Sequence, residues 1–324
     1  MTGLIKTGAI FKKMEESKIL TQNLRRFIGA AITATALLSF SSGDALAQRD
    51  FSKVKIKTIP VGGAVTMLMG AGGNIGVVSG ADGVFMIDDQ FAPLTPKILA
   101  AVKKISAKPI RFLLNTHWHF DHTGGNENLG KMGVTIVAHE NVRSTMSVSQ
   151  PLKAFKMTVP ASPKIALPVI TFNDSATFHL NGETIRIKHV PPAHTDGDSI
   201  VHFVNSNIIH TDDTFFNGFY PFIDVEHGGS IDGMITAAGI TLGLANDQTK
   251  IIPGHGPLAT KKQLVAYRDM LIKARDAIKM AAKGGKSADQ VIAADPLKTL
   301  NEKWGKGFLK PQIFVKIVLG GMKG

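Results

Sequence analysis

The sequence of 324 residues contains no cysteine. This absence excludes disulfide bonds, a thiol nucleophile, an iron–sulfur cluster and any zinc site with thiolate ligands. A metal site in this chain therefore has to use imidazole and carboxylate ligands, and the sequence offers 11 histidines and 25 acidic residues for that purpose.

The apolar segment near the N-terminus is too short to span a bilayer. It runs from Phe27 to Phe40, 14 residues, whereas a transmembrane helix needs about 18 or more. Arg25 and Arg26 precede it, and Ala45–Ala47 provides a small-x-small cleavage site before Gln48. This order of basic, apolar and cleavable regions predicts an export signal.

We therefore expect residues 1–47 to be removed, with translation beginning at Met1 or Met14. The mature chain would be residues 48–324, periplasmic or secreted and without a membrane span. A chain free of cysteine is compatible with a bacterial periplasm, where disulfides are permitted but not required.

Acidic residues are outnumbered by basic ones, 25 to 37, and the formal net charge is +12. This charge is consistent with solubility, and the positive field would also favour an anionic small-molecule substrate. Nucleic acid is not an expected partner, because the chain is predicted to be exported and has no motif that combines basic and aromatic residues. The sequence leaves the oligomeric state open.

Apolar periodicity predicts a layered α/β architecture with one mixed sheet or two sheets. Short apolar blocks separated by glycine indicate strands, and helical spacing follows them. The stretch 150–169 carries four prolines and is predicted to be a surface loop. The order of the predicted elements is strands within 53–89, a helix over 93–105, a strand over 110–114, strands within 176–210, and helices over 231–244 and 261–280.

Three imidazoles and one carboxylate lie within six positions directly after the predicted strand 110–114. These residues are His117, His119, Asp121 and His122. Imidazole and carboxylate oxygen both suit zinc. A catalytic zinc ion usually has three protein ligands plus water, so four donors this close together favour two adjacent metal ions.

Further candidate ligands follow later strands and are flanked by turn-forming residues. They are His194 in Pro-Pro-Ala-His-Thr-Asp, Asp212 and Asp213 in His-Thr-Asp-Asp-Thr, and His255 in Pro-Gly-His-Gly-Pro. A single histidine in a loop is more often hydrogen-bonded or solvated than a ligand, but together with the first cluster these residues become candidate ligands.

Taken together, the pattern H-x-H-x-D-H at 117–122, His194, Asp213 and the Gly-His-Gly-Pro around His255 resembles the metallo-β-lactamase superfamily. The resemblance implies an αββα sandwich of the α/β (α+β) class, in which two mixed sheets are flanked by helices. It also implies a single domain over 48–324 with a helical C-terminal extension over about 261–324, and a site between the sheets at one edge.

The resemblance also implies the ligand set of a dinuclear zinc centre. Family members usually have Gly-Asp at the bridging position, where this chain has Asp212-Asp213; Asp213 is preferred because Phe215 to Gly218 then follows at the usual offset, with Asp212 as the fallback. By position, the first zinc would be bound by His117, His119 and His194, the second by Asp121, His122 and His255, and Asp213 would bridge them.

The implied activity is that of an exported zinc hydrolase in which a metal-bound hydroxide attacks a carbonyl. A β-lactam is the most concrete substrate, followed by a lactone or a thioester. Asp121 would orient the hydroxide, and Tyr220 would direct its hydroxyl at a substrate oxyanion. Candidates to support the ligating imidazoles are Asp196, Asp198 and Thr123.

Two alternatives belong to other classes. The first is a mononuclear iron oxidoreductase resembling the sulfur dioxygenases of this superfamily, with His117, His194 and Asp213 as ligands. Complete ligands for a second metal argue against it. The second is a non-catalytic metal-binding module on the same fold, and the retention of every expected ligand argues against that.

Overall fold

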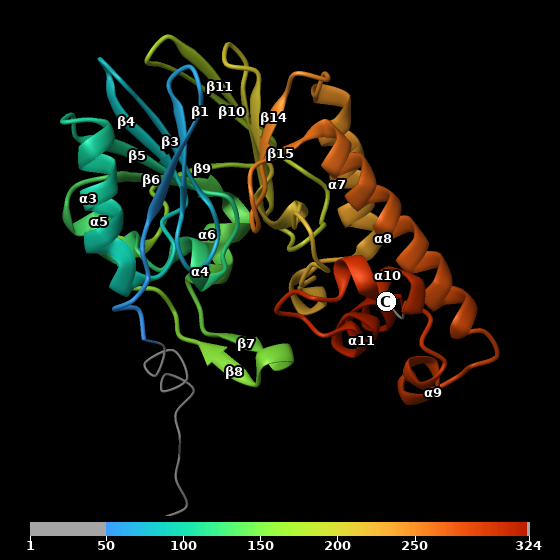
Figure 1. The fold of residues 1–324 in the computed structure, drawn as a ribbon. Coiled ribbons are helices and arrows are strands. Elements are labelled where there is room, and N and C mark those ends of the chain that lie inside the picture. The colour runs from blue at the N-terminus through green and yellow to red at the C-terminus, as the bar shows by residue number, and fades with distance from the viewer. Residues whose placement is uncertain (1–49, 323–324) are drawn as a thin grey trace, which may run out of the picture. The chain divides into compact units, whose positions relative to one another are not determined.

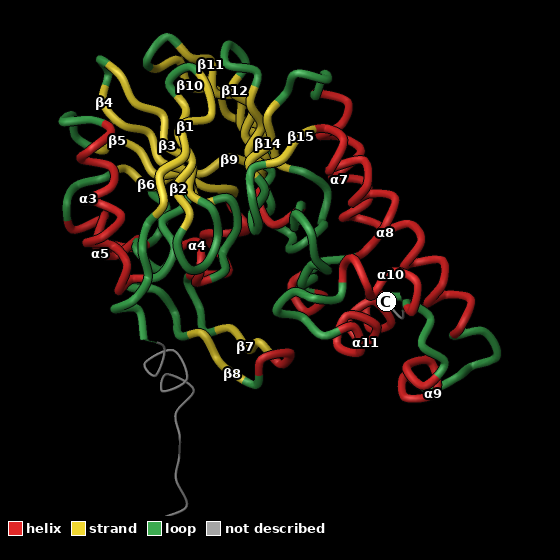
Figure 2. Tube along the Cα trace, viewed as in Figure 1, coloured by secondary structure: helices red, strands yellow, loops and turns green. Residues whose placement is uncertain are grey.

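The computed structural model describes residues 50–322. The chain divides into two compact units, residues 1–48 and 49–324, and every described residue belongs to the second. The expected export signal over 1–47 lies outside the described residues. Figure 1 shows the course of the chain through the second unit, and Figure 2 shows its helices and strands.

The first sheet has seven strands in the order β1-β2-β3-β4-β5-β6-β9. Pairing is antiparallel from β1 to β4 and parallel from β4 to β9. Its strands are β1 Lys57–Gly62, β2 Val65–Met69, β3 Ile75–Gly80, β4 Gly83–Ile87, β5 Ile110–Asn115, β6 Thr135–His139 and β9 Ile170–Phe172.

The second sheet has six strands in sequence order from β10 to β15. Only β13 and β14 pair in parallel. Its strands are β10 Ser175–Leu180, β11 Glu183–His189, β12 Ser199–Phe203, β13 Ile208–His210, β14 Lys250–Ile252 and β15 Ala259–Thr260.

Helices cover the outer faces of the two sheets. Figure 1 shows α3 and α5 beside the first sheet and α7 and α8 beside β14 and β15 of the second. The helices are α3 Thr95–Ile105, α4 Phe120–Thr123, α5 Asn126–Lys131, α6 Glu140–Met146, α7 Ile231–Leu244, α8 Lys261–Ala281, α9 Ala288–Ala293, α10 Lys298–Trp304 and α11 Pro311–Gly321. Short 3-10 helices are η1 Ala92–Leu94, η2 Lys153–Phe155, η3 Lys164–Ala166, η4 Asp212–Thr214 and η5 Val225–His227.

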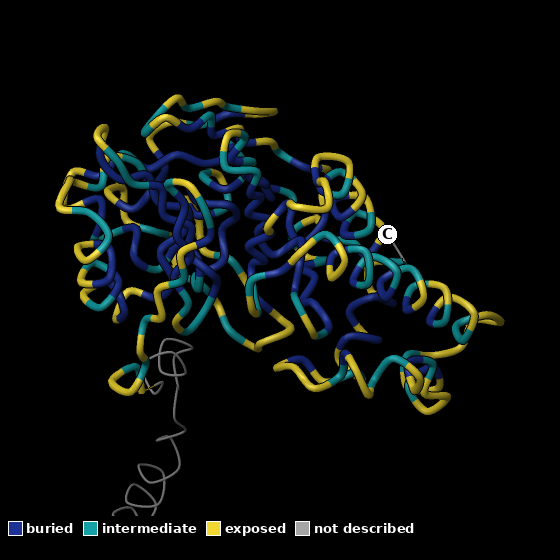
Figure 3. Tube along the Cα trace, turned by 45° about the horizontal axis from the view of Figure 1, so that its top comes forward, coloured by how far each residue is buried: buried dark blue, intermediate teal, exposed yellow. Residues whose placement is uncertain are grey.

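Two hydrophobic clusters explain the layers. One joins the facing sides of both sheets, with Phe85 and Leu114 from the first sheet packed with Phe203 from the second. The other joins the second sheet to α7, α8 and the C-terminal helices, and includes Tyr267 and Phe314. Figure 3 shows that the buried parts of the described chain lie in the interior and the exposed parts at the outside. The sheets therefore pack face to face, and the expected αββα sandwich is confirmed.

One expectation about the fold is wrong in detail. The stretch 150–169 contains a two-stranded hairpin, β7 Gln150–Leu152 and β8 Met157–Val159, rather than loop alone. Pro151 lies within β7, opposite Thr158. Both strands of an isolated hairpin are edge strands, so the missing N–H of a proline can face away from the partner strand.

The predicted helix over 261–280 agrees with α8, and the region after it folds into three further helices. Over residues 50–322, the structure shows no helix that combines the length and the apolar character needed to cross a bilayer.

Candidate metal centre

The predicted ligands lie in loops that follow strands of both sheets. His117 and His119 come directly after β5, and His194 lies between β11 and β12. Asp213 is in η4 after β13, and His255 lies between β14 and β15. Because β13 and β14 run parallel, the loops that follow them meet at one edge, where Phe216 and His255 form a β-bridge.

The first group of donors consists of three buried imidazoles. His119 Nδ1 lies 3.0 Å from His117 Nε2 and 2.8 Å from His194 Nε2. None of the three residues is more than 5% exposed. The three nitrogen atoms therefore converge on one point inside the protein.

The opposite ring nitrogens fix the protonation of these imidazoles. His117 Nδ1 lies 2.7 Å from Asp212 Oδ1, His119 Nε2 lies 2.9 Å from Asp224 Oδ2, and His194 Nδ1 lies 2.9 Å from the Phe222 carbonyl. A neutral imidazole that donates to an oxygen with one nitrogen presents a lone pair on the other. Three lone pairs facing one another cannot satisfy each other, whereas a divalent cation can accept all three, so these residues fit a metal ion.

The second group combines imidazole and carboxylate. His255 Nε2 lies 3.4 Å from Asp121 Oδ2 and 3.4 Å from His122 Nε2. His122 Nδ1 lies 2.8 Å from Asp88 Oδ2, which again directs the other nitrogen of the ring into the group. The two imidazoles and one carboxylate form a second set of donors that fits a cation.

Asp213 lies between the two groups. Its Oδ2 is 3.5 Å from His194 Nε2 in the first group and 3.3 Å from His255 Nε2 in the second, and its Oδ1 is 3.2 Å from His122 Nε2. Asp212 instead contacts His117 and Thr116. The geometry therefore favours Asp213 over Asp212 for the bridging position.

The two groups differ in electrostatic character. Burial and the neighbouring imidazoles lower the pKa of His117 well below its usual range. Burial, reinforced by His119, also lowers the pKa of His194, to about 4. A metal ion binds the neutral form of imidazole, so the lowered pKa values of His117 and His194 favour binding of a cation by these two rings.

In the second group, carboxylates oppose the effect of burial on the imidazoles. Asp213 and Asp121 raise the pKa of His255 to about 9, although burial lowers it. The imidazoles of His122 and His255 in turn lower the pKa of Asp121 to about 2, although burial raises it. These carboxylates therefore favour positive charge at this position, which a bound divalent cation would supply in place of protons.

Three aspartates support the imidazoles, and the sequence did not single out two of them, Asp88 and Asp224. Asp88 directly follows β4 and accepts hydrogen bonds from the Thr116 backbone N–H at 2.9 Å and from the Thr116 hydroxyl at 2.7 Å, in addition to its contact with His122. Asp212, predicted only as a fallback bridge, supports His117. The sequence signal that could have identified Asp88 is the pair Asp88-Asp89 directly after an apolar strand.

The residues expected to support the imidazoles have other contacts. Asp198 accepts the backbone N–H groups of His194 at 2.6 Å and Thr195 at 2.9 Å, so it fixes the loop rather than a ring. The Thr123 hydroxyl donates to the carbonyls of Trp118 and His119. The Asp196 backbone N–H donates to the His227 carbonyl.

Tyr220 also lies elsewhere, which corrects the expectation that it faces a substrate. Its ring stacks on Phe314 with centroids 4.6 Å apart, and its hydroxyl donates to Asn301 Oδ1 at 3.0 Å. Burial raises the pKa of its hydroxyl. The aromatic segment after Asp213 therefore divides: Tyr220 packs in the hydrophobic core, while Phe216 and Phe222 line a pocket.

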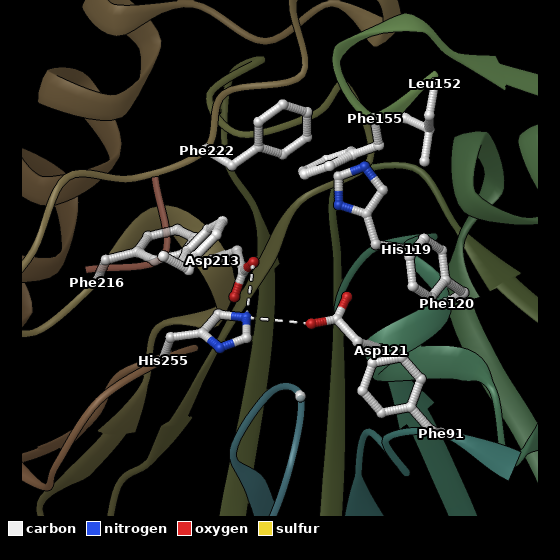
Figure 4. A pocket seen from close by; sticks show the side chains of 12 residues that line it. Phe91, His119, Phe120, Asp121, Leu152, Phe155, Asp213, Phe216, Phe222 and His255 are labelled. Carbon is white, nitrogen blue, oxygen red and sulfur yellow. Dashed lines mark ion pairs between the residues drawn. The ribbon is translucent and has the colours of Figure 1, made fainter. Parts of the chain in front are cut away.

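This pocket borders both groups of donors and has a volume of about 290 Å³. His119, Asp121, Asp213 and His255 form its polar floor, and Figure 4 shows their side chains pointing into the space between them. A small molecule in the pocket would therefore contact both groups of donors.

Gly73 leaves the space that His122 occupies. A Cβ atom at Gly73 would overlap the imidazole ring of His122. We expect Gly73→Ala to displace this ring and to remove the metal of the second group while leaving that of the first. Elemental analysis of the purified variant beside wild type measures this as a lower metal content per chain in Gly73→Ala.

A matched control is Gly239→Ala in α7, where an added Cβ meets no atom within 4 Å. Because alanine is favoured over glycine within a helix by roughly 0.5–1 kcal/mol, this variant should keep its metal and its stability. A metal content in Gly73→Ala equal to that of wild type would contradict the placement of His122.

The family assignment comes from sequence comparison. The family model described as "Metallo-beta-lactamase superfamily" matches residues 69–259, more than half of the chain. Hydroxyacylglutathione hydrolase of Pelagibacter ubique is 28% identical over 109 residues, which cover 33% of this chain and 37% of that protein. Atrochrysone carboxyl ACP thioesterase of Aspergillus chevalieri is 25% identical over 201 residues, which cover 61% of this chain and 56% of that protein. The chain thus matches less than two thirds of either relative.

Solved structures show the same fold. A metallo-beta-lactamase from Pontibacter korlensis superposes with a TM-score of 0.55 at 17% identity, covering 67% of this chain and 99% of that one. A sec-alkylsulfatase from Pseudomonas sp. superposes with a TM-score of 0.59 at 17% identity, covering 81% and 50%. Together with the family match and the arrangement of histidines and aspartates, these findings show that the chain belongs to the metallo-beta-lactamase superfamily.

Proposed function

We propose that this chain is a hydrolase that binds two zinc ions and cleaves a carbonyl substrate, with a thioester as the first candidate. The observation that carries the proposal is the placement of Asp213 between two sets of converging donors. Two relatives are named hydroxyacylglutathione hydrolase and atrochrysone carboxyl ACP thioesterase, which supports a thioester.

The first zinc would be held by the imidazoles of the first group and the second by the second group, with Asp213 shared. When bound, the two ions would polarise a carbonyl oxygen and make a water molecule acidic enough to act as a nucleophile near neutral pH. The chain itself supplies the orientation. Asp212, Asp224 and Asp88 hold the rings, and such partners fix both the tautomer and the direction of a ligating histidine.

Asp121 is the acidic residue best placed to handle a proton. Its side chain is 21% exposed, lines the pocket and keeps Oδ2 3.4 Å from His255 Nε2. A carboxylate at the boundary between donors and pocket can accept a hydrogen bond from a nucleophilic water and orient it towards a bound carbonyl.

The proposal predicts zinc-dependent hydrolysis. Purified protein should contain two zinc ions per chain by elemental analysis. It should release thiol from an acyl thioester, lose this activity in a chelator and regain it on addition of zinc. A lactone and a chromogenic cephalosporin serve as comparison substrates. One iron per chain with no hydrolysis of any of the three would contradict the proposal and support oxidation instead.

We also propose that the protein is exported, on the signal described by Arg25, Arg26 and the apolar segment that follows. N-terminal sequencing of protein recovered from the periplasm or the medium should begin at Gln48. A chain there that retains Met1 or Met14 would refute the cleavage.

A further inference from the structure

The pocket above the cluster combines a polar floor with an apolar wall. Six phenylalanines form most of the wall and Leu152 adds to it. Figure 4 shows rings of this wall around the donors of the floor. The phenylalanines are Phe91, Phe120, Phe155, Phe216, Phe222 and Phe308. A pocket with a few polar anchors and a largely apolar lining binds the apolar part of a ligand by burial and positions its reacting group by the anchors.

In the part of the chain that the structure describes, the apolar wall of the pocket has no cationic side chain. Among the described residues that line the pocket, none is a lysine or an arginine. Lys153 lies beside Leu152, but its Nζ is 2.7 Å from Glu226 Oε1. The positive net charge of the sequence is therefore not displayed on the wall. A carboxylate on the distant part of a substrate would be buried there without a partner, which is costly.

Two of the phenylalanines remain exposed at the mouth of the pocket. Phe155 is 44% exposed and Phe308 is 57% exposed, and both are among the large exposed apolar residues of the described chain. Phe155 packs on Phe222 with ring centroids 4.8 Å apart, and Phe308 lies 6.3 Å from Phe216. Exposed apolar side chains that border a pocket indicate a surface covered by a ligand.

Both rings come from segments outside the two sheets. Phe155 is in η2, at the tip of the β7–β8 hairpin, and Phe308 precedes α11, beyond the last residue matched by the family model. The hairpin is fastened where it lies. The Lys153 backbone N–H donates to Glu226 Oε2 at 3.1 Å, and Gln150 Oε1 is 3.1 Å from His227 Nε2. The fold therefore holds Phe155 at the mouth.

We infer that the site takes a thioester or ester whose acyl group is an uncharged hydrocarbon chain or ring, held between Phe155 and Phe308. This inference rests on the proposed function for the chemistry and on the pocket for the acyl group. It differs from the sequence-based expectation of an anionic substrate.

The test compares N-acetylcysteamine thioesters that share one uncharged leaving group. Released thiol can be measured with a thiol reagent because the protein has no cysteine. Each buried methylene contributes about fourfold to affinity. We therefore expect octanoyl to exceed acetyl by at least about 100-fold in kcat/KM, and butanoyl to exceed succinyl, its charged counterpart of equal chain length, by more than about tenfold.

The double variant Phe155→Ala/Phe308→Ala should lower the octanoyl-to-acetyl ratio of kcat/KM by about tenfold or more, as apolar contact area is lost. Met280→Ala is the matched control, since this apolar side chain is 63% exposed on α8 and does not line the pocket. It should leave the ratio unchanged. A succinyl thioester cleaved as well as the butanoyl one, or no dependence on chain length, would overturn the inference.

A binding experiment separates failure of the inference from failure of the proposed function. If the thioesters, the lactone and the cephalosporin are all left intact, the proposed function fails, and isothermal titration calorimetry of octanamide and acetamide then tests the pocket alone. Octanamide should bind more tightly than acetamide to the wild-type chain and lose affinity in the double variant. Equal binding of the two amides would overturn the inference independently of turnover.

Discussion

Asp213→Ala is expected to lower both the zinc content and the turnover of the protein more than any other single change. Its carboxylate contacts His122, His194 and His255, so its loss removes a donor from each group. Partners that only support ligands already cost about 10–100-fold in metal affinity or activity when removed. We therefore expect kcat/KM to fall by more than about 100-fold and zinc to fall below two ions per chain.

Elemental analysis and thioester kinetics on the same preparation measure both effects. Asp247→Ala is the matched control, because this aspartate is 93% exposed and pairs with Lys261 only at 3.8 Å. An Asp213→Ala variant that keeps two zinc ions and the wild-type rate would show that the bridging position is not functional.

Asp88→Asn is expected to weaken the binding of zinc by the second group of donors. Asp88 contacts the Nδ1 atom of His122 while it also binds the backbone and hydroxyl of Thr116. An amide in its place presents only one oxygen and must direct its NH₂ group at one of these donors. We expect zinc affinity of the second group to weaken by about 10–100-fold, measured by competition with a chromogenic chelator.

The substitution is chosen so that the backbone does not confound the result. Asp88 has φ of 61°, in the left-handed region, which asparagine tolerates as well as aspartate does. Circular dichroism should thus stay close to wild type, as it should in Asp247→Asn. If Asp88→Asn bound two zinc ions with unchanged affinity, His122 would not depend on Asp88 for its orientation.

The sequence itself singled out the four donors within 117–122, which are closely spaced after an apolar strand. His194, Asp213 and His255 lie in loops after strands and completed the set through the family resemblance. His117 and His119 follow β5, and His255 follows β14, so a local pattern indicates both the element and its end. A layered α/β architecture could be predicted for the same reason, since the order of strands and helices is local information, whereas the αββα sandwich was implied by the family resemblance.

The supporting aspartates could not be predicted in this way. Asp88 supports His122 from 34 positions earlier in the chain, and Asp224 contacts His119 from 105 positions later. These pairings depend on β4 lying parallel to β5 and on the course of the loop after η4, and no spacing within the sequence encodes them. Near Asp88 the sequence shows only a strand followed by a turn.

Tyr220 illustrates a different limit. Five aromatic residues between 215 and 222 share the same composition signal, and periodicity does not show which of them faces the site. The structure separates them by the helices they meet: Tyr220 packs against Phe314 of α11, a contact across 94 positions, while Phe222 turns towards the pocket. Burial in a core formed by the C-terminal helices therefore decides the role of this tyrosine.

The apolar wall of the pocket likewise depends on long-range packing. Phe155 and Phe308 are far apart in the sequence, and neither belongs to a strand of the two sheets. The prolines of the stretch 150–169 led to the prediction of a surface loop, which missed the hairpin that presents Phe155.

X-ray diffraction from crystals of the zinc-loaded protein, recorded at the zinc absorption edge, tests the dinuclear centre most directly. We expect two anomalous peaks, one among His117, His119 and His194 and the other among Asp121, His122 and His255, with Asp213 in contact with both. A single peak, or peaks at residues outside these two groups, would contradict it.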